Sequence, residues 1–178
     1  NTVKHTPGCN QVERPSLPDL STYRLLFKLI PLNIRARGFH MAIIPGQIND
    51  VSIHFGLNVH NSVDPKLLGF LQHTIRPNIV NGPTLTSIYI SSLKDQHNLP
   101  SRHMQGSGKA IDISRINGMR MSTHYPSDPT VAQVTEALQR AFENWEGRRE
   151  NFGPLFKRKH GKNHPVGGHN DHIHFSVD

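Results

Sequence analysis

Apolar residues recur at helical spacing in two long stretches of this chain, and an Asp-Pro pair opens each of them. The first stretch covers residues 64–76 and stops before Pro77, and the second covers residues 128–146 and stops at a glycine. Aspartate is a favoured N-cap, and proline is favoured in the first helical turn. We therefore predict two helices that each face a core with one side. A shorter helix is expected over residues 19–30.

Runs rich in β-branched or alternating apolar residues predict the strands. Such runs occur at residues 39–44, 51–55, 84–92, 109–114 and 119–122 and at the end of the chain. Asn117-Gly118 joins two of them and is typical of a tight hairpin. The basic, glycine-rich residues 147–168 are interpreted as a loop. Helices and hairpins in this order favour an α+β fold, in which a small antiparallel sheet is flanked by helices.

The distribution of these elements divides the chain into two parts. Residues 1–63 hold short pieces between prolines and glycines, and we interpret them as an N-terminal arm or accessory segment of open role. Residues 64–178 hold the predicted helices and hairpins and form the expected domain, which is long enough to bury a core. The single cysteine, Cys9, excludes an internal disulfide and a cysteine-based zinc site.

The formal net charge of +7 predicts attraction to a polyanion, such as nucleic acid, anionic lipid or the bacterial cell wall. The basic residues are dispersed apart from two clusters, Arg148-Arg149 and residues 157–160, and aromatic residues make up only 7% of the chain. This pattern favours general electrostatic attraction over specific recognition of nucleic acid. No apolar run is long enough to cross a bilayer, so no membrane span is expected. The chain begins at Asn1 without a visible signal peptide, which suggests a processed product.

Histidines are concentrated near the end of the chain, where His169, His172 and His174 surround Asp171. Side chains alternate along a strand, so His172 and His174 share one face of the predicted final strand. Two imidazoles beside a carboxylate can hold a divalent metal and manage protons around it. Two histidine ligands alone make a weak site, and a third ligand is therefore expected elsewhere.

We expect the further ligands in residues 101–113. His103 precedes a glycine-rich bend, and Asp112 lies on the strand that follows, pointing away from the apolar face of Ile111 and Ile113. Imidazole, carboxylate and imidazole form a normal catalytic zinc set, which leaves the fourth position for water. The alternative is that Asp112 caps a turn and His103 is an ordinary loop residue. The histidines near the end of the chain favour the metal site.

Three motifs resemble those of the zinc peptidases of the lysostaphin, D-Ala-D-Ala carboxypeptidase and hedgehog group. They are Ser101-x-His103, Gly108-x-Ala110-x-Asp112-Ile113 and Asp171-x-x-His174. The likeness is greatest to D-Ala-D-Ala-type peptidoglycan peptidases and covers roughly residues 64–178. It implies a hedgehog- or D-Ala-D-Ala-peptidase-like fold. It also implies that His103, Asp112 and His174 bind Zn2+ and that Asp171 is the general base.

The segment from His169 to His174 is also similar to the penicillin-insensitive murein endopeptidases. In that family, histidines at the positions of His169 and His172 line the active site. In the mechanism that the resemblance implies, zinc lowers the pKa of its water toward about 7, and Asp171 accepts the proton. His172, with His169, then donates to the tetrahedral oxyanion or orients Asp171.

The sequence departs from the family pattern at two points. The family usually places the aspartate seven positions after the histidine, whereas Asp112 lies nine positions after His103, with the extra residues in 104–107. Where the family often carries an arginine for a substrate carboxylate, this chain offers Lys94. A lysine clamps a carboxylate less tightly than a guanidinium, which favours an endopeptidase. Ser101 is expected either to brace its loop or to contact the substrate.

Together these features imply a zinc-dependent peptidoglycan peptidase that hydrolyses peptide bonds in the stems or cross-links of bacterial cell wall, such as a phage lysin or tail enzyme. Such an enzyme would be extracellular, periplasmic or virion-associated. One alternative is a hedgehog-like binding module that keeps zinc without catalysis, although Asp171 and His172 argue for activity. Another is a His-metal-finger nuclease, because Asp171-His172-Ile173 is similar to its Asp-His-Ile motif. Those nucleases need a helix after the strand, and this sequence stops at Asp178.

Overall fold

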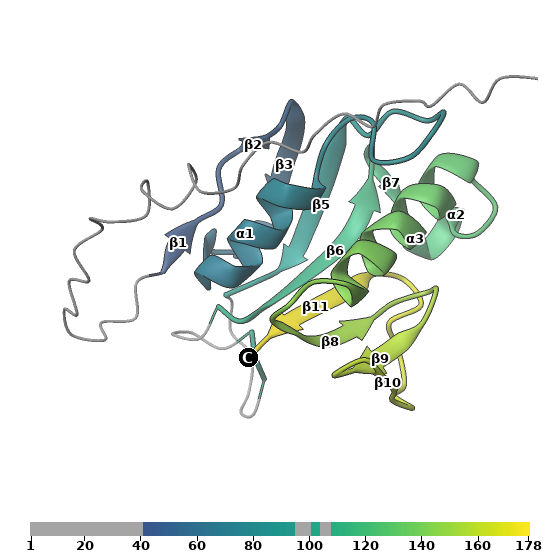
Figure 1. Cartoon of the computed structure of the whole chain (residues 1–178). Coiled ribbons are helices and arrows are strands. Elements are labelled where there is room, and N and C mark those ends of the chain that lie inside the picture. Colours follow the sequence, from purple (N-terminus) through teal and green to yellow (C-terminus); the bar gives the residue numbers. More distant parts are fainter. Residues whose placement is uncertain (1–40, 95–100, 104–107) are drawn as a thin grey trace, which may run out of the picture. The chain divides into compact units, whose positions relative to one another are not determined.

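The computed structural model describes residues 41–94, 101–103 and 108–178, and these residues belong to one compact unit, Gly38–Asp178 (Figure 1). Its elements in chain order are β1 (Ala42–Ile43), β2 (Gln47–Ile48), β3 (Val51–Phe55), β4 (Ser62–Val63), α1 (Pro65–Thr74), β5 (Ser87–Ser92), β6 (Ala110–Ile116), β7 (Met119–Arg120), α2 (Met121–His124), α3 (Pro129–Glu143), β8 (Arg148–Phe152), β9 (Lys157–Lys159), β10 (Lys162–Asn163) and β11 (Ile173–Val177). The predicted α+β class is confirmed. In the described part of the chain, no helix combines the length and apolarity that a membrane span requires.

One nine-stranded sheet dominates the fold. Its strand order is β10-β9-β8-β11-β6-β5-β3-β2, and β7 pairs with β6 beside this path. The pairs are antiparallel except for β3 and β5, which run parallel. β1 and β4 form a separate two-stranded sheet. The sheet is therefore mostly antiparallel, as predicted, and its centre is formed by β11 and β6.

The helices α1 and α3 cover the same face of this sheet (Figure 1). Three aromatic rings join them to it: the ring centroid of Phe70 lies 4.8 Å from that of Phe142 and 5.3 Å from that of Phe175. Phe175 is the cross-strand partner of Ile111, so both side chains point toward the helices. Strand alternation then places Asp112 and His174, which are also cross-strand partners, on the opposite face.

The Asp-Pro pairs begin the two long helices as predicted. The side chain of Asp64 accepts a hydrogen bond from the backbone N–H of Lys66, and Asp128 accepts one from Val131, each at 2.9 Å. The Asn117-Gly118 hairpin is also confirmed, because both residues have positive φ between β6 and β7. The helix expected over residues 19–30 lies outside the described residues, as does Cys9.

Two predictions need correction. Residues 147–168, interpreted as a loop, contain β8, β9 and β10. The prediction missed them because these short, charged strands lack the apolar alternation that marks a strand in a sequence. The unit also begins before the predicted start at residue 64, because β2 and β3 extend the main sheet beyond β5. The rest of the predicted arm, residues 1–40, lies outside the described residues.

Candidate metal centre

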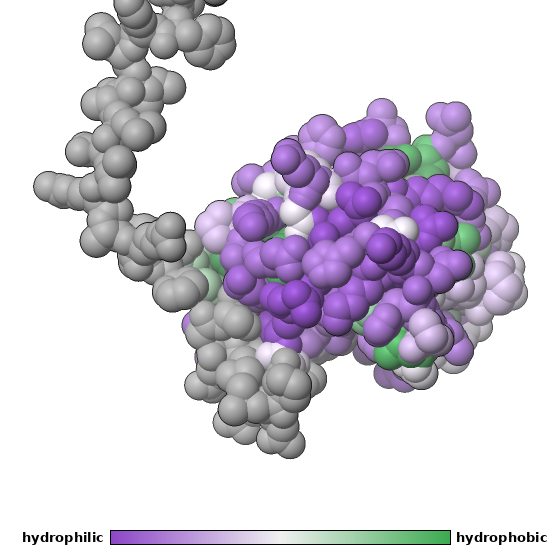
Figure 2. Space-filling model, turned by 60° about the horizontal axis from the view of Figure 1, so that its bottom comes forward, coloured by the Kyte–Doolittle hydropathy of each residue, from purple (hydrophilic) through white to green (hydrophobic). Residues whose placement is uncertain are grey.

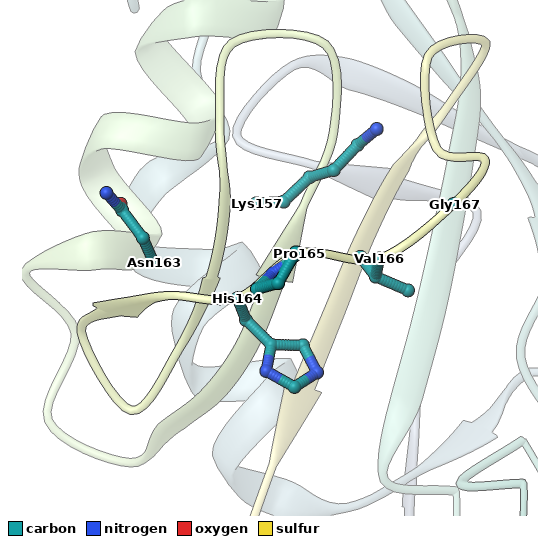
Figure 3. A pocket seen from close by; sticks show the side chains of 6 residues that line it. All are labelled: Lys157, Asn163, His164, Pro165, Val166 and Gly167. Atoms are coloured by element: carbon teal, nitrogen blue, oxygen red, sulfur yellow. The ribbon is translucent and has the colours of Figure 1, made fainter.

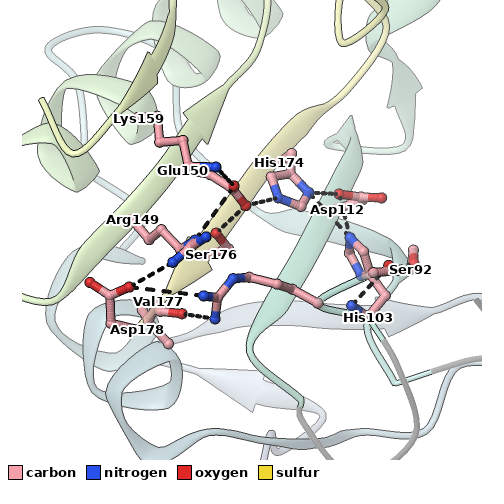
Figure 4. Close-up of polar contacts among 12 residues, drawn as sticks. Ser92, His103, Asp112, Arg149, Glu150, Lys159, His174, Ser176, Val177 and Asp178 are labelled. Carbon is pink, nitrogen blue, oxygen red and sulfur yellow. Dashed lines mark hydrogen bonds and ion pairs between the residues drawn. The ribbon is translucent and has the colours of Figure 1, made fainter. Parts of the chain in front are cut away.

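His103, Asp112 and His174 converge on the face of the sheet opposite the helices (Figure 4). Their ligand atoms all lie within 4.8 Å of one another. Asp112 Oδ1 is 2.8 Å from His174 Nδ1 and 3.3 Å from His103 Nε2, and the two ring nitrogens are 3.2 Å apart. Only 5% of His103 and 8% of His174 is exposed. The structure thus brings together the three residues that the sequence predicted as metal ligands.

His103 lies on a loop, and the backbone around it sets its orientation. Arg102 donates a hydrogen bond from Nη1 to the carbonyl oxygen of Val177 at 2.8 Å, which attaches this loop to β11. Ser101 Oγ accepts the backbone N–H of His103 at 3.2 Å, so Ser101 braces the loop. His103 Nδ1 lies 3.1 Å from the carbonyl oxygen of Leu93, and a carbonyl only accepts. This contact favours a hydrogen on Nδ1, so Nε2 is the nitrogen that would bind a metal.

A bulge in β5 brings a further side chain to this group. Ile90 pairs with Ile113 on the helix face, and Ser92 pairs with Asp112, so Ser91 is the extra residue between them. The extra residue turns Ser92 to the face that carries Asp112, where its Oγ lies 3.1 Å from His103 Nδ1. The sequence run at residues 84–92 predicted the strand but contained no signal for this bulge.

Glu150 of β8 supports His174 from the side opposite the metal group, and sequence reasoning missed it. Its Oε2 lies 3.6 Å from His174 Nε2, and it accepts a hydrogen bond from Ser176 Oγ at 2.7 Å. Lys159 Nζ lies 3.0 Å from the other carboxylate oxygen (Figure 4). A carboxylate behind a ligating imidazole orients the ring and increases its basicity. The signal that could have revealed Glu150 is the alternation in the run Arg149-Glu150-Asn151-Phe152, which is weak because only Phe152 is apolar.

The carboxylates of Asp112 and Glu150 and the imidazole of His174 shift one another's pKa values. Burial raises the pKa of the Asp112 carboxyl, but hydrogen bonds from His103 and His174 outweigh it and hold the pKa well below the usual range. Burial lowers the pKa of His174, but Asp112 and Glu150 outweigh it and raise this pKa to about 9. The contact with His174 likewise lowers the pKa of Glu150. Near neutral pH this shift favours the doubly protonated His174 in the metal-free protein, and a bound cation would have to displace the proton on the ligating nitrogen.

A cavity of about 530 Å3 opens onto the three ligands. It is lined by Ser101, Arg102, His103, Asp112, Arg149, Glu150, Phe152, Lys159, His169 and His174. Two imidazoles and one carboxylate satisfy three positions of a tetrahedral metal and leave the fourth open. The donor set, its burial and the adjoining cavity therefore fit a bound metal ion with an exchangeable position.

The other residues from the C-terminal motif lie at the rim of this group. Asp171 Oδ1 is 2.7 Å from His172 Nδ1, and His172 Nε2 is 4.0 Å from Asp112 Oδ1. The side chain of Asp171 is 64% exposed, so this carboxylate connects to the metal group through His172. The ring of His169 lies 5.6 Å from that of His174, and burial lowers its pKa. The general-base role of Asp171 stays a prediction.

Lys94 lies in a different hollow. This hollow of about 300 Å3 is formed with His60, Asn61 and Ser62, and Lys94 Nζ donates to Ser62 Oγ at 3.4 Å. The structure therefore does not bring Lys94 into the cavity of the metal group. The cations that line that cavity are Arg102, Arg149 and Lys159. The residues between His103 and Gly108, where the chain departs from the family spacing, lie outside the described residues.

Comparisons with known proteins give no relative for this chain. No protein-family model, no curated protein and no solved structure matches it. The metal group, its surroundings and the sequence motifs are therefore the features that indicate a function.

Proposed function

We propose that this protein is a zinc-dependent peptidoglycan peptidase. The observation that carries the proposal is the convergence of His103, Asp112 and His174 beside an open cavity. This is the ligand set that the resemblance implies. Strand pairing brings Asp112 and His174 together, and the loop attached to β11 by Arg102 adds His103. A hedgehog- or D-Ala-D-Ala-peptidase-like arrangement of the sheet belongs to the same proposal.

The donor set suits Zn2+, which is the metal that we propose. Two imidazole nitrogens and one carboxylate oxygen suit Zn2+, whereas Ca2+ and Mg2+ prefer oxygen ligands. Zinc with three protein ligands supplies Lewis acidity and an activated water molecule. Glu150 and the Leu93 carbonyl hold the two imidazoles from behind, so the ligands need little rearrangement.

Proton transfer is assigned to Asp171 and His172. With the carboxylate of Asp171 at 2.7 Å from Nδ1, a hydrogen on that nitrogen leaves His172 Nε2 facing the metal group. His172 Nε2, on the side of Asp112, can then accept a proton from water and return it to the leaving amine. Asp171 would stabilise the imidazole of His172 while it is charged. Hydrogen bonding to His172 lowers the pKa of Asp171, which keeps this carboxylate ionised near neutral pH.

The proposed substrate is a peptide bond in the stems or cross-links of bacterial cell wall. The face shown in Figure 2 is almost entirely hydrophilic, and the chain carries a net charge of +7, which suits a polar, anionic polymer. Because Lys94 lies outside the cavity, the preference for an endopeptidase rests on the likeness at His169 and His172. The proposed location is extracellular, periplasmic or virion-associated.

The test combines metal analysis with hydrolysis of purified cell-wall sacculi. We expect about one zinc per chain in the wild type and in Asp171→Asn, and loss of zinc in His103→Ala. Release of new amino groups should be lost in both variants. His60→Ala is the matched control, because His60 is an exposed histidine in a separate hollow, and it should behave as the wild type.

Other outcomes would decide against the proposal. Zinc binding without hydrolysis of any wall preparation would favour the non-catalytic binding module. Metal-dependent cleavage of DNA that Asp112→Asn abolishes would favour the nuclease. Absence of bound metal in the wild type would contradict the metal centre itself.

A further inference from the structure

The fold joins two basic segments that are separate in the sequence. β8 begins with Arg148-Arg149, and β9 consists of Lys157, Arg158 and Lys159. The two strands are antiparallel neighbours, with Lys159 opposite Glu150 and Lys157 opposite Phe152. β10 extends the sheet edge and places Lys162 opposite Lys159. The three lysines 157, 159 and 162 are called the lysine ridge below.

The lysine ridge lies on the face of the metal group. Phe152 is the cross-strand partner of His174 in β11, and Lys157 is the partner of Phe152 in β9. Cross-strand partners point to the same face, so the ridge continues from His174 toward the sheet edge. Arg158 alternates to the other face, where its Nη1 lies 3.6 Å from Glu143 of α3.

Within the described part of the chain, two of the three ridge lysines have no carboxylate partner. Lys159 pairs with Glu150, but Lys157 donates to the neutral side chain of Asn170 at 3.0 Å. Among the described residues, no carboxylate forms an ion pair with Lys157 or Lys162. Like charges directly opposite each other on paired strands are unfavourable, as at Lys159 and Lys162. An anion bound along the ridge would remove this repulsion.

A second hollow adjoins the ridge. It has a volume of about 660 Å3 and is lined by Lys157, Asn163, His164, Pro165, Val166 and Gly167 (Figure 3). The ring of His164 stacks on Phe152 at 5.7 Å and 15°, and Phe152 stacks on His174 at 5.7 Å and 17°. One aromatic ring therefore lies between this hollow and the metal ligand His174. Phe152 also lines the metal cavity, so the cavity and this hollow are neighbours on the same face.

We propose that the lysine ridge and this hollow bind the carboxylate-bearing part of an extended polymer next to the bond that is cut. The inference rests on the proposed function, which it deepens by assigning the substrate's acidic groups to Lys157 and Lys162. Both lysines are partly or fully exposed, so their contribution is long-ranged, additive and weakened by salt. The ridge therefore governs attachment to the polymer, whereas the metal group governs hydrolysis.

The experiment compares binding of the full chain to purified, insoluble sacculi by sedimentation. The double variant Lys157→Gln/Lys162→Gln should bind about three- to tenfold more weakly at low salt, and the difference should vanish near 0.5 M salt, where the Debye length falls to about 4 Å. The matched control is Arg76→Gln/Arg140→Gln, which removes the same charge in and near the helices that cover the other face. It should bind nearly as the wild type.

Two further measurements identify the ligand of the ridge and test the ridge separately from the proposed function. Amidation of the carboxylates in the sacculi should abolish the difference between the double variant and the control, and a persistent difference would contradict a carboxylate ligand. Hydrolysis of the same sacculi by the wild type is measured alongside binding. Equal binding by the double variant and its control would contradict the proposal that the lysine ridge binds the polymer. A wild type that binds sacculi through the ridge but hydrolyses no wall substrate would overturn the proposed function alone.

Discussion

The two faces of the central strands β6 and β11 carry opposite chemistry. Toward the helices lie Ile111, Ile113, Ile173 and Phe175, all of them fully buried hydrocarbon side chains. Toward the cavity lie Asp112, His174 and Ser176. Burial away from water is sufficient to stabilise the apolar side chains of the helix face. The cavity face buries ionisable groups that need a proton or a metal between them.

This difference shows how one strand can serve stability and function at the same time. Because alternation is strict, Ile173 and Phe175 can anchor β11 in the core while His174 between them stays in the cavity. A shift of register by one residue would exchange the two faces, so the apolar face also fixes the position of the candidate ligands Asp112 and His174. Changes on the helix face should therefore alter unfolding, and changes on the cavity face should alter metal binding.

The largest effect is expected from Phe175→Ala. Phe175 is fully buried and its ring contacts Phe70 and Phe142, so truncation should lower the free energy of unfolding by about 3–5 kcal/mol. Urea unfolding of the metal-free protein measures this loss. Leu57→Ala is the control, because Leu57 is exposed, and should change stability by less than about 0.5 kcal/mol. A loss for Phe175→Ala below about 1 kcal/mol would contradict the assignment of this face as the core.

Asp112→Asn should leave the fold intact and weaken metal binding more than about 100-fold, because loss of a ligand exceeds loss of an outer partner. The substitution keeps the shape of the side chain and removes its charge. Competition with a coloured chelator measures the affinity. Asp50→Asn provides the control, since Asp50 is exposed in a turn with φ of 67°, a conformation that asparagine tolerates. Unchanged affinity in Asp112→Asn would exclude this carboxylate as a ligand.

The pH dependence of stability should have opposite signs without and with metal. In the metal-free protein the pKa of His174 rises from 6.5 to about 9, so its stabilisation is complete below pH 6.5 and is lost as pH rises through 9. This loss amounts to about 3 kcal/mol. Because the pKa of Asp112 is lowered in the folded protein, its ionised carboxylate stabilises the fold above the unfolded pKa near 3.8. This stabilisation is lost in acid. The metal-loaded protein should instead gain stability from pH 6.5 upward, because the cation competes with the proton on His174.

Urea midpoints between pH 5 and 10, measured with chelator or with added zinc, test these slopes. His174→Gln should flatten the decline of the metal-free protein above pH 6.5. Parallel slopes in the two conditions would show that His174 and the metal do not compete.

The smallest of these effects is expected from Glu150→Gln. The variant removes the charge 3.6 Å behind His174 Nε2 and should weaken metal binding about 10- to 100-fold while all three ligands remain. Chelator competition again gives the affinity, and Glu146→Gln is the control because Glu146 is exposed. Equal affinities in the two variants would show that Glu150 does not affect metal binding and that its role is confined to its contacts with Ser176 and Lys159.

The sequence predicted the elements whose signals are local. The Asp64 and Asp128 caps and the Asn117-Gly118 hairpin each depend on a few neighbouring residues, and all three are confirmed. Alternation also predicted that Asp112 points away from the apolar side of its strand, and the register with β11 confirms it. The motif likeness added His103 and His174 as the partners of Asp112, and the three ligand atoms do meet.

Other features escaped prediction because they depend on pairings between distant residues. Glu150 comes close to His174 only when β8 pairs with β11. Ser92 points to the face of Asp112 only because of the bulge in β5. Lys94 was assigned to the substrate from its position along the chain, but the sheet places it beside Ser62.

The sequence by itself determined the caps, the hairpin, the alternation of the central strands and the identity of the three candidate ligands. Steric and hydrogen-bonding preferences within a few residues are sufficient for the caps, the hairpin and the alternation, whereas the candidate ligands came from the types and spacing of the residues in the motifs. Only the tertiary structure decided the carboxylate behind His174, the braces of His103 and the union of two basic segments into the lysine ridge. These depend on which strands pair and in which register, and the burial of the whole sheet against α1 and α3 selects that register.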